Sequence, residues 1–151
     1  MKLAEALIIR ADLQTRISEL QTRAEENTKV QQGDSPILDP MKIIAQINEA
    51  ITQLETIVVK INTSNLQVHL PDGRPMTEAL ARRDHLRMRW NSLKKIVDSA
   101  NESVSRYSLS EIKMITVVDV AGLQTQMDEL AMQRRQLDMQ IQATNWTSDL
   151  L

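Results

Sequence analysis

The sequence contains no cysteine and no phenylalanine, and only Trp90, Tyr107 and Trp146 carry large aromatic rings. The absence of cysteine excludes disulfides, thiol catalysis and thiolate metal ligands, and it fits a protein of the reducing cytoplasm. With an aromatic content of 2%, the core must be built from Leu, Ile, Val, Ala and the eight Met. Such a core suits helical packing better than a β-sandwich or a deep cofactor pocket.

Turn residues and membrane signals are also scarce. Three Gly and four Pro in 151 residues predict few, long secondary-structure elements. No run approaches the roughly 18–20 apolar residues of a membrane span. The first ten residues carry Glu5 and Arg10 inside their apolar run, which is not typical of a signal peptide. We therefore expect a single helical domain over 1–151, in the cytoplasm and without membrane association.

Motifs for catalysis or metal binding are missing. The two histidines, His69 and His85, lack a paired ligand spacing, and the carboxylates are dispersed. The sequence has no EF-hand loop, no glycine-rich phosphate loop and no nucleophile elbow. It therefore indicates no catalytic residue, no cofactor and no metal, and it favours a non-enzymatic protein.

The sequence does contain four lines of apolar residues spaced alternately three and four apart, each called a seam below. This is the period of one helix face and is close to the a/d stripe of a coiled coil. It predicts helices over 2–29, 41–61, from Thr77 to about Ser103, and from Asp119 to about Trp146. The four seams are Leu3, Ala6, Leu13, Ile17, Leu20 and Ala24; Ile44, Ile47, Ile51, Leu54, Val58 and Ile61; Ala79, Leu86, Trp90, Leu93, Val97, Ala100 and Val104; Leu123, Met127, Leu130, Leu137 and Ile141.

Several residues predict where these helices begin and end. Asp39, followed by Pro40, Thr77 and Asp119 have the chemistry of helix N-caps. Gly33 predicts a left-handed end to the first helix. The last residues, 147–151, are expected to fray.

A β element is predicted between the second and third helices. Leu66, Val68 and Leu70 alternate with polar residues, and Pro71, Asp72 and Gly73 form a turn sequence, so a β-hairpin is predicted over about 66–76. The β-branched run 111–118 is a possible third strand. A capping-box pattern at Ser108 and Glu111 leaves a helix open there.

The predicted fold class is therefore mainly α, with four long helices in an antiparallel bundle or coiled coil and a small β-hairpin. Each seam is narrow, close to two residues in seven. Such seams suit contacts among two to four helices better than a broad globular core, so we expect a homo-oligomer.

Three arginines, Arg10, Arg83 and Arg134, interrupt the seams. Burying a guanidinium costs several kcal/mol unless it is paired and hydrogen-bonded. We interpret the three as residues that fix helix register, because polar seam residues do so in coiled coils. A bound anion or small ligand is the alternative. The nearby acidic residues available for pairing are Glu5, Asp12, Glu129 and Asp138.

The segment 74–95 is the most basic part of the chain, with seven Lys and Arg against Glu78 and Asp84. An arginine-rich helix can contact nucleic-acid phosphates. These side chains, however, spread around the predicted helix, and the whole chain has a net charge of −2. We therefore favour pairing with acidic neighbours over nucleic acid. The possible basic surface comprises Arg82, Arg87, Arg89, Lys94 and Lys95.

Four blocks of the sequence resemble a bacterial family of unknown function whose members are sometimes labelled septicolysin-like. The blocks are MKLAEALIIRADLQTRISELQTRAEEN, VQQGDSP, INTSN and RYSLSEIKMITVVDVAGLQTQMDELA. The resemblance covers nearly the whole chain. It implies a helical, coiled-coil-rich bacterial protein and no catalytic residues.

Together these observations favour a non-enzymatic, self-assembling helical protein whose partners are copies of itself and an unknown protein. The first alternative is an oligomer, enzymatic or not, that binds an anion or small molecule at a subunit junction near the seam arginines. The weaker alternative is nucleic-acid binding through the basic third helix.

Overall fold

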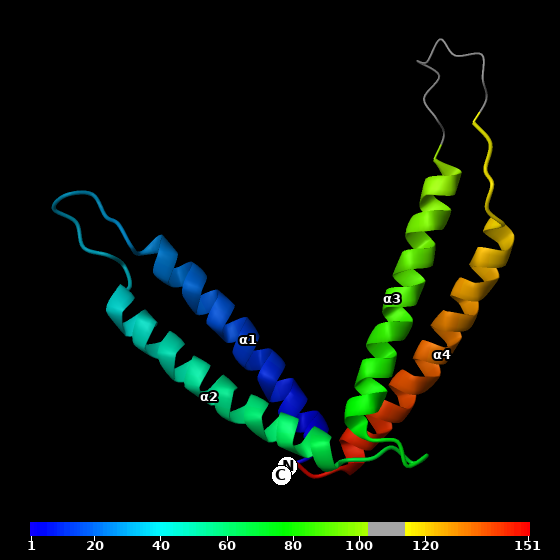
Figure 1. Cartoon of the computed structure of the whole chain (residues 1–151). Helices are drawn as coiled ribbons and strands as arrows, with labels where there is room; N and C mark the ends of the chain where they lie inside the picture. Colours follow the sequence, from blue (N-terminus) through cyan, green and yellow to red (C-terminus); the bar gives the residue numbers. More distant parts are fainter. Residues whose placement is uncertain (103–113) are drawn as a thin grey trace. The chain divides into compact units, whose positions relative to one another are not determined.

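The computed structural model describes residues 1–102 and 114–151, and these residues form four helices (Figure 1). The helices are α1 (Leu3–Glu26), α2 (Pro40–Gln67), α3 (Met76–Asn101) and α4 (Val120–Thr147). No sheet forms among the described residues. The mainly α fold class with four long helices is confirmed.

The chain divides into two compact units. The first comprises Met1–His69 together with Gln142–Leu151, and the second comprises Leu70–Ile141. In the first unit α1 and α2 run antiparallel, side by side, and in the second α3 and α4 do the same (Figure 1). The expectation of one domain over 1–151 stays a prediction.

Two of the three predicted N-caps are confirmed; the prediction for Thr77 is wrong, because α3 begins at Met76 after Pro75 as its N-cap residue. The Asp39 carboxylate accepts a hydrogen bond of 2.9 Å from the backbone N–H of Met41, and Pro40 opens the helix. The Asp119 carboxylate accepts one of 3.0 Å from the backbone N–H of Gly122. The side chains thus supply acceptors for N–H groups that have no partner inside the helix.

The predicted end of the first helix is wrong. Helix α1 ends at Glu26, and its C-cap residue is Asn27 with a φ of −108°. Gly33 does adopt a left-handed conformation, with φ of +99°. It therefore shapes the loop after α1 and does not end the helix.

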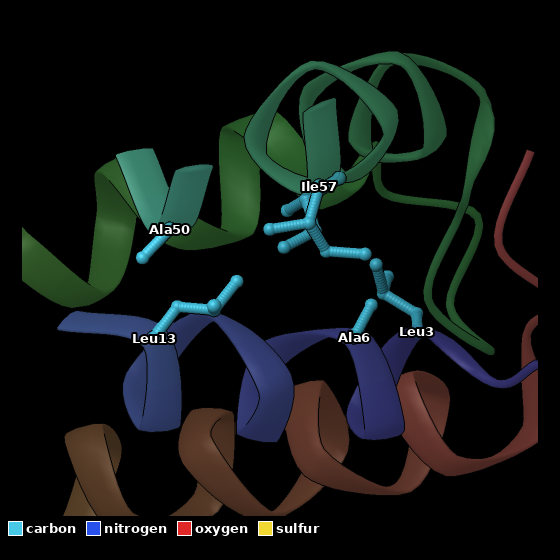
Figure 2. Close-up of a cluster of buried hydrophobic side chains, with 6 residues drawn as sticks. Leu3, Ala6, Leu13, Ala50 and Ile57 are labelled. Atoms are coloured by element: carbon cyan, nitrogen blue, oxygen red, sulfur yellow. The ribbon is translucent and has the colours of Figure 1, made fainter. Parts of the chain in front are cut away.

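The core of the first unit lies between α1 and α2. Leu13 of α1 points toward Ala50 of α2, and Ile57 lies close to Ala6 and Leu3 (Figure 2). A large side chain facing a small one lets two helices pack closely without leaving a void. The buried members of this core are Leu3, Ala6, Leu13, Ala50, Ile57 and Ile61.

The inward face of α2 differs from the prediction. Of the predicted seam, Ile61 is buried and Leu54 and Val58 pack against the core, but Ile44 and Ile51 remain 42% and 45% exposed. The residues one position earlier, Ile43 and Ala50, are buried, as is Ile57. The inward face therefore keeps Leu54, Val58 and Ile61 of the predicted seam and takes Ile43, Ala50 and Ile57 in place of Ile44 and Ile51.

In the other three helices, several residues of each predicted seam are buried, and this confirms the predicted inward faces. In α1 these are Leu3, Ala6, Leu13 and Leu20; in α3, Ala79, Leu86 and Val97; in α4, Leu137 and Ile141. Trp90, which the third seam includes, is half-buried.

The predicted β-hairpin over 66–76 forms only as a tight turn: Pro71, Asp72 and Gly73 reverse the chain as predicted, but the flanking strands are reduced to single bridge residues, His69 and Pro75. Helix α2 continues through Gln67, and α3 begins at Met76. The N–H of Leu70 donates to the carbonyl of Arg74 at 2.8 Å, and the N–H of Gly73 donates to the carbonyl of Leu70 at 2.9 Å. This short turn between two helices replaces the rest of the hairpin.

The possible third strand, 111–118, is also not a strand where it is described. Residues 114–118 have no regular secondary structure. Residues 111–113 and the capping-box pattern at Ser108 and Glu111 lie outside the described residues.

The C-terminal residues are ordered, contrary to the prediction that they fray. The N–H of Leu3 donates to the carbonyl of Ser148 at 3.0 Å, and the N–H of Leu150 donates to that of Met1 at 2.9 Å. The chain ends therefore lie together (Figure 1). Leu150 also packs against the core of the first unit. These backbone bonds, called the terminal clasp below, fix both ends on that unit.

Ser64 joins the terminal clasp to α2. Its side chain is fully buried; the hydroxyl donates to the carbonyl of Lys60 at 2.9 Å and accepts from the N–H of Leu151 at 2.9 Å. We expect Ser64→Ala to lower the free energy of unfolding by about 1 kcal/mol, because the part-buried hydrogen bond to the N–H of Leu151 is lost. Urea unfolding and hydrogen exchange of the C-terminal amides measure this.

Thr63→Ala is the matched control for Ser64→Ala. The Thr63 hydroxyl is exposed and bonds only the carbonyl of Val59, within its own helix. An equal effect of the two substitutions would contradict a role for Ser64 in holding the C-terminus.

The terminal clasp carries one ion pair with a predicted pH dependence. The Lys2 ammonium lies 2.9 Å from the Asp149 carboxylate, and its hydrogen bond and charge lower the pKa of Asp149 below the ordinary 3.8. Because the pKa of Asp149 is lowered, the ion pair stabilises the folded state at pH values above the ordinary pKa. This contribution to stability is lost as the pH falls through the lowered pKa. We expect Lys2→Met to raise the pKa of Asp149, as measured by NMR titration. An unchanged pKa would show that the pair does not form in solution.

Candidate interaction surfaces

An exposed apolar stripe runs along α2 beside the inward face. It consists of Met41, Ile44 and Ile51, which are 70%, 42% and 45% exposed, and the preceding loop carries two more exposed apolar residues, Ile37 and Leu38. We call these five residues the outer stripe. The loop is held in place by the N–H of Leu38, which donates to the Asn27 side chain at 3.1 Å. Positions 41, 44 and 51 share one side of the helix, and exposed apolar side chains that gather on one side of an element mark interaction sites.

The outer stripe exists because α2 has adjacent apolar residues along much of its length. Ile43 and Ile44, or Ile57 and Val58, offer two apolar faces that overlap. Ile57 and Val58 both pack in or against the core, whereas Ile43 is buried and Ile44 stays 42% exposed. These doublets are the sequence signal of a second apolar side on α2, which a single apolar line with helical spacing does not include.

A groove of about 550 Å³ lies between α3 and α4 in the second unit. Met88, Leu93 and Leu130 give it an apolar lining, and Arg89 and Glu129 lie on opposite helices beside it. The remaining lining residues are Ser92, Gln126 and Gln133. Neither Arg89 nor Glu129 has an ion-pair partner among residues 1–102 and 114–151. The groove was not predicted from the sequence, although Arg89 was.

Two seam arginines meet one carboxylate. Arg83 of α3 and Arg134 of α4 have their Nε atoms 4.0 and 3.6 Å from the carboxylate of Asp138. Asp138 was among the acidic residues predicted to be available. Arg83 also contacts the neighbouring Asp84 at 3.3 Å. The pairs are about one-third to one-half exposed, so each contributes no more than about 1 kcal/mol.

The third seam arginine, Arg10, is placed differently. Its Nε is buried and has no hydrogen-bond partner in the described part of the chain. Glu5, a predicted partner, instead accepts the backbone N–H of Lys2 at 2.6 Å. Arg10 belongs to the first unit, and Arg83 and Arg134 belong to the second.

The role of the seam arginines in helix register stays a prediction, and Arg134→Leu tests it. Because Arg134 is half-exposed, we expect a change in stability of less than about 1 kcal/mol but an altered oligomer mass or a broader unfolding transition. Light scattering and urea unfolding provide these measurements. Unchanged mass with an equally steep transition would contradict the assignment.

The predicted basic surface is only partly gathered. Arg82, Arg87 and Lys95 are exposed, and Lys94 pairs with Asp98 of its own helix at 2.8 Å. Arg89 instead lines the groove. These charges therefore form no single basic face joined to a stacking aromatic ring, because Trp90 is half-buried.

The histidines are not brought together either. His69 and His85 are both exposed, and the Nδ1 atom of His69 lies 3.0 Å from the carbonyl of Gln67. Among residues 1–102 and 114–151, no group of three His, Asp or Glu side chains is arranged to hold a metal ion. In the same residues no helix is both long enough and apolar enough to span a bilayer.

The two pairs of antiparallel helices make this a mainly α-helical protein. Its family is identified from its sequence. The chain belongs to a family of unknown function, DUF6847, whose model matches residues 10–150. It is also similar to the crystal structure of a functionally unknown conserved protein from Corynebacterium diphtheriae. That similarity has a TM-score of 0.90 and 34% identity, and it covers 100% of this chain and 99% of that one. No curated protein matches the chain.

The resemblance found in the sequence is thus confirmed as far as a family of unknown function. The septicolysin-like label finds no support in these relatives, whose function is itself unknown.

Proposed function

We propose that the protein is a non-enzymatic, self-associating helical protein of the bacterial cytoplasm, and that copies of the chain contact one another through the outer stripe of α2. The observation that carries the proposal is the exposure of Ile44 and Ile51 on a helix whose other apolar face is already covered by α1. Covering large aliphatic side chains gains about 25 cal/mol for each Å² removed from water.

The charges on α2 support a second copy as the occupant. The helix carries Lys42 and Lys60 against Glu49 and Glu55, so its net charge is zero. Two copies of a neutral helix associate without net repulsion, and Lys42 of one copy can lie beside an acidic residue of the other. A strongly charged partner would gain little from this face.

The charges around the arginines weaken the two alternative functions, anion binding and nucleic-acid binding. Asp138 already neutralises Arg83 and Arg134 in part, which leaves less positive charge for an anion. The alternative of an anion or small-molecule site near the seam arginines therefore rests on Arg10 alone, and nucleic-acid binding rests on a dispersed set of cations.

Light scattering on an eluting size-exclusion peak tests the proposal. We expect the wild-type chain to elute with a mass that is a multiple of 17.2 kDa. The double variant Ile44→Glu with Ile51→Glu should shift toward the monomer, because two carboxylates replace the apolar contact.

Gln46→Glu with Gln53→Glu is the matched control, since both glutamines are exposed and lie on the opposite side of α2 from Ile44. The control should keep the wild-type mass. A wild-type mass of one chain at all concentrations would contradict the proposal, as would an equal effect of both double variants.

A further inference from the structure

We propose that the groove between α3 and α4 is a second self-association surface, occupied by the same groove of another copy related by a two-fold axis. This inference rests on the proposed self-association. It adds a second interface, the groove, and the ion pairs that hold two copies together there. The occupant is a second copy of this chain.

The lining of the groove has the composition of a helix–helix contact. Leu93 and Leu130 are half-buried, and Met88 remains 63% exposed on α3. Two helices leave these side chains only partly covered, whereas two hairpins packed face to face would cover them in a four-helix arrangement. Methionine suits such a contact because its flexible side chain adapts to the opposing surface.

The charges beside the groove are self-complementary. Arg89 lies on α3 and Glu129 on α4, and neither has an ion-pair partner in the described residues. A two-fold axis running along the groove places α3 of one copy over α4 of the other. It therefore brings Arg89 of each copy to Glu129 of the other and forms two equivalent ion pairs, as a two-fold interface requires.

The same charges disfavour other occupants. One cation and one anion leave the groove with no net charge, so it does not select an anionic ligand or nucleic acid. Ser92, Gln126 and Gln133 around it are neutral donors and acceptors of the kind found at the rim of protein–protein interfaces.

Charge reversal on separate copies tests the inference. Arg89→Glu and Glu129→Arg, each made in the full chain, place like charges at both contacts of a homodimer. We expect each variant to weaken self-association at least tenfold, measured by light scattering over a concentration series. An equimolar mixture restores opposite charges at both contacts, so it should recover the wild-type mass as a mixed species, identified by native mass spectrometry.

Arg82→Glu is the matched control, because Arg82 is exposed on the same helix and does not line the groove. It should leave the mass unchanged. Rescue by mixing separates an interchain pair from one within a chain, since two damaged chains recover only if their charges meet across an interface.

The failures are distinguishable. A wild-type monomer contradicts the proposed function and this inference together. An assembled wild type whose mass does not respond to Arg89→Glu or Glu129→Arg overturns only the groove inference, and failure of the mixture to recover the mass does the same. Such results would assign the groove to another occupant.

Discussion

Replacing Ile57 with alanine should lower the free energy of unfolding by about 2–5 kcal/mol. Ile57 is 8% exposed and lies in the core between α1 and α2 (Figure 2). The truncation removes three buried carbon atoms and leaves a cavity that the two helices cannot close fully. Urea unfolding followed by circular dichroism, at a concentration where association is constant, measures the loss.

Ile51→Ala is the control for Ile57→Ala, with the same chemical change on the same helix. Ile51 is 45% exposed, so its truncation should change the stability of one chain by about 0.5 kcal/mol or less. If Ile51 lies in the interface between copies, the loss will instead depend on protein concentration. A larger, concentration-independent loss at Ile51 than at Ile57 would show that α2 faces α1 with its predicted seam.

Replacing Ala50 with aspartate should destabilise the first unit by about 3–5 kcal/mol at neutral pH. Ala50 is 2% exposed and faces Leu13 (Figure 2). The substitution buries a carboxylate without a partner, and an uncompensated buried charge carries a penalty of this size. Burial raises the pKa of the introduced carboxyl, so the deficit should shrink as the pH falls toward the unfolded-state value of about 4.

Ala11→Asp is the matched control, because Ala11 is exposed on α1. It should cost less than about 1 kcal/mol and should show no such pH dependence. Equal losses at positions 11 and 50 would contradict the packing of Ala50 against Leu13.

The helices were predictable because their signals are local. The seams repeat with the helical period, and the caps at Asp39 and Asp119 act within three residues along the chain. Such features depend little on the rest of the fold. The inward face of α2 was not predictable in this way, since Ile43 and Ile44 both continue an apolar line.

The β-hairpin prediction failed outside its turn because the alternation of Leu66, Val68 and Leu70 is too short to outweigh contacts made elsewhere. The last turns of α2 are held by buried Ile61 and Ser64, and Ser64 bonds Leu151 from the far end of the sequence. The same long-range contact explains why the C-terminus is ordered. No window of neighbouring residues contains both partners of that bond.

Of the candidate surfaces, the sequence supplied the residues but not their grouping. It singled out Arg83, Arg134 and Asp138, and the structure brings these three side chains together. It also singled out Arg89, but the groove beside Arg89 depends on how α3 packs against α4. Arg10 shows the reverse case, because none of its predicted partners reaches its buried Nε.

By itself, then, the sequence determined the helical class, the number of long helices, two of their starts and three of the four inward faces. Periodicity and capping are properties of a few consecutive residues, which is why they could be established without the fold. Only the tertiary structure decided which apolar face of α2 remains open, how the chain ends are held, and which charges lie beside one groove. Those features depend on the shape of the facing helix, because Leu13 fits against Ala50, and on pairs of residues far apart in the chain.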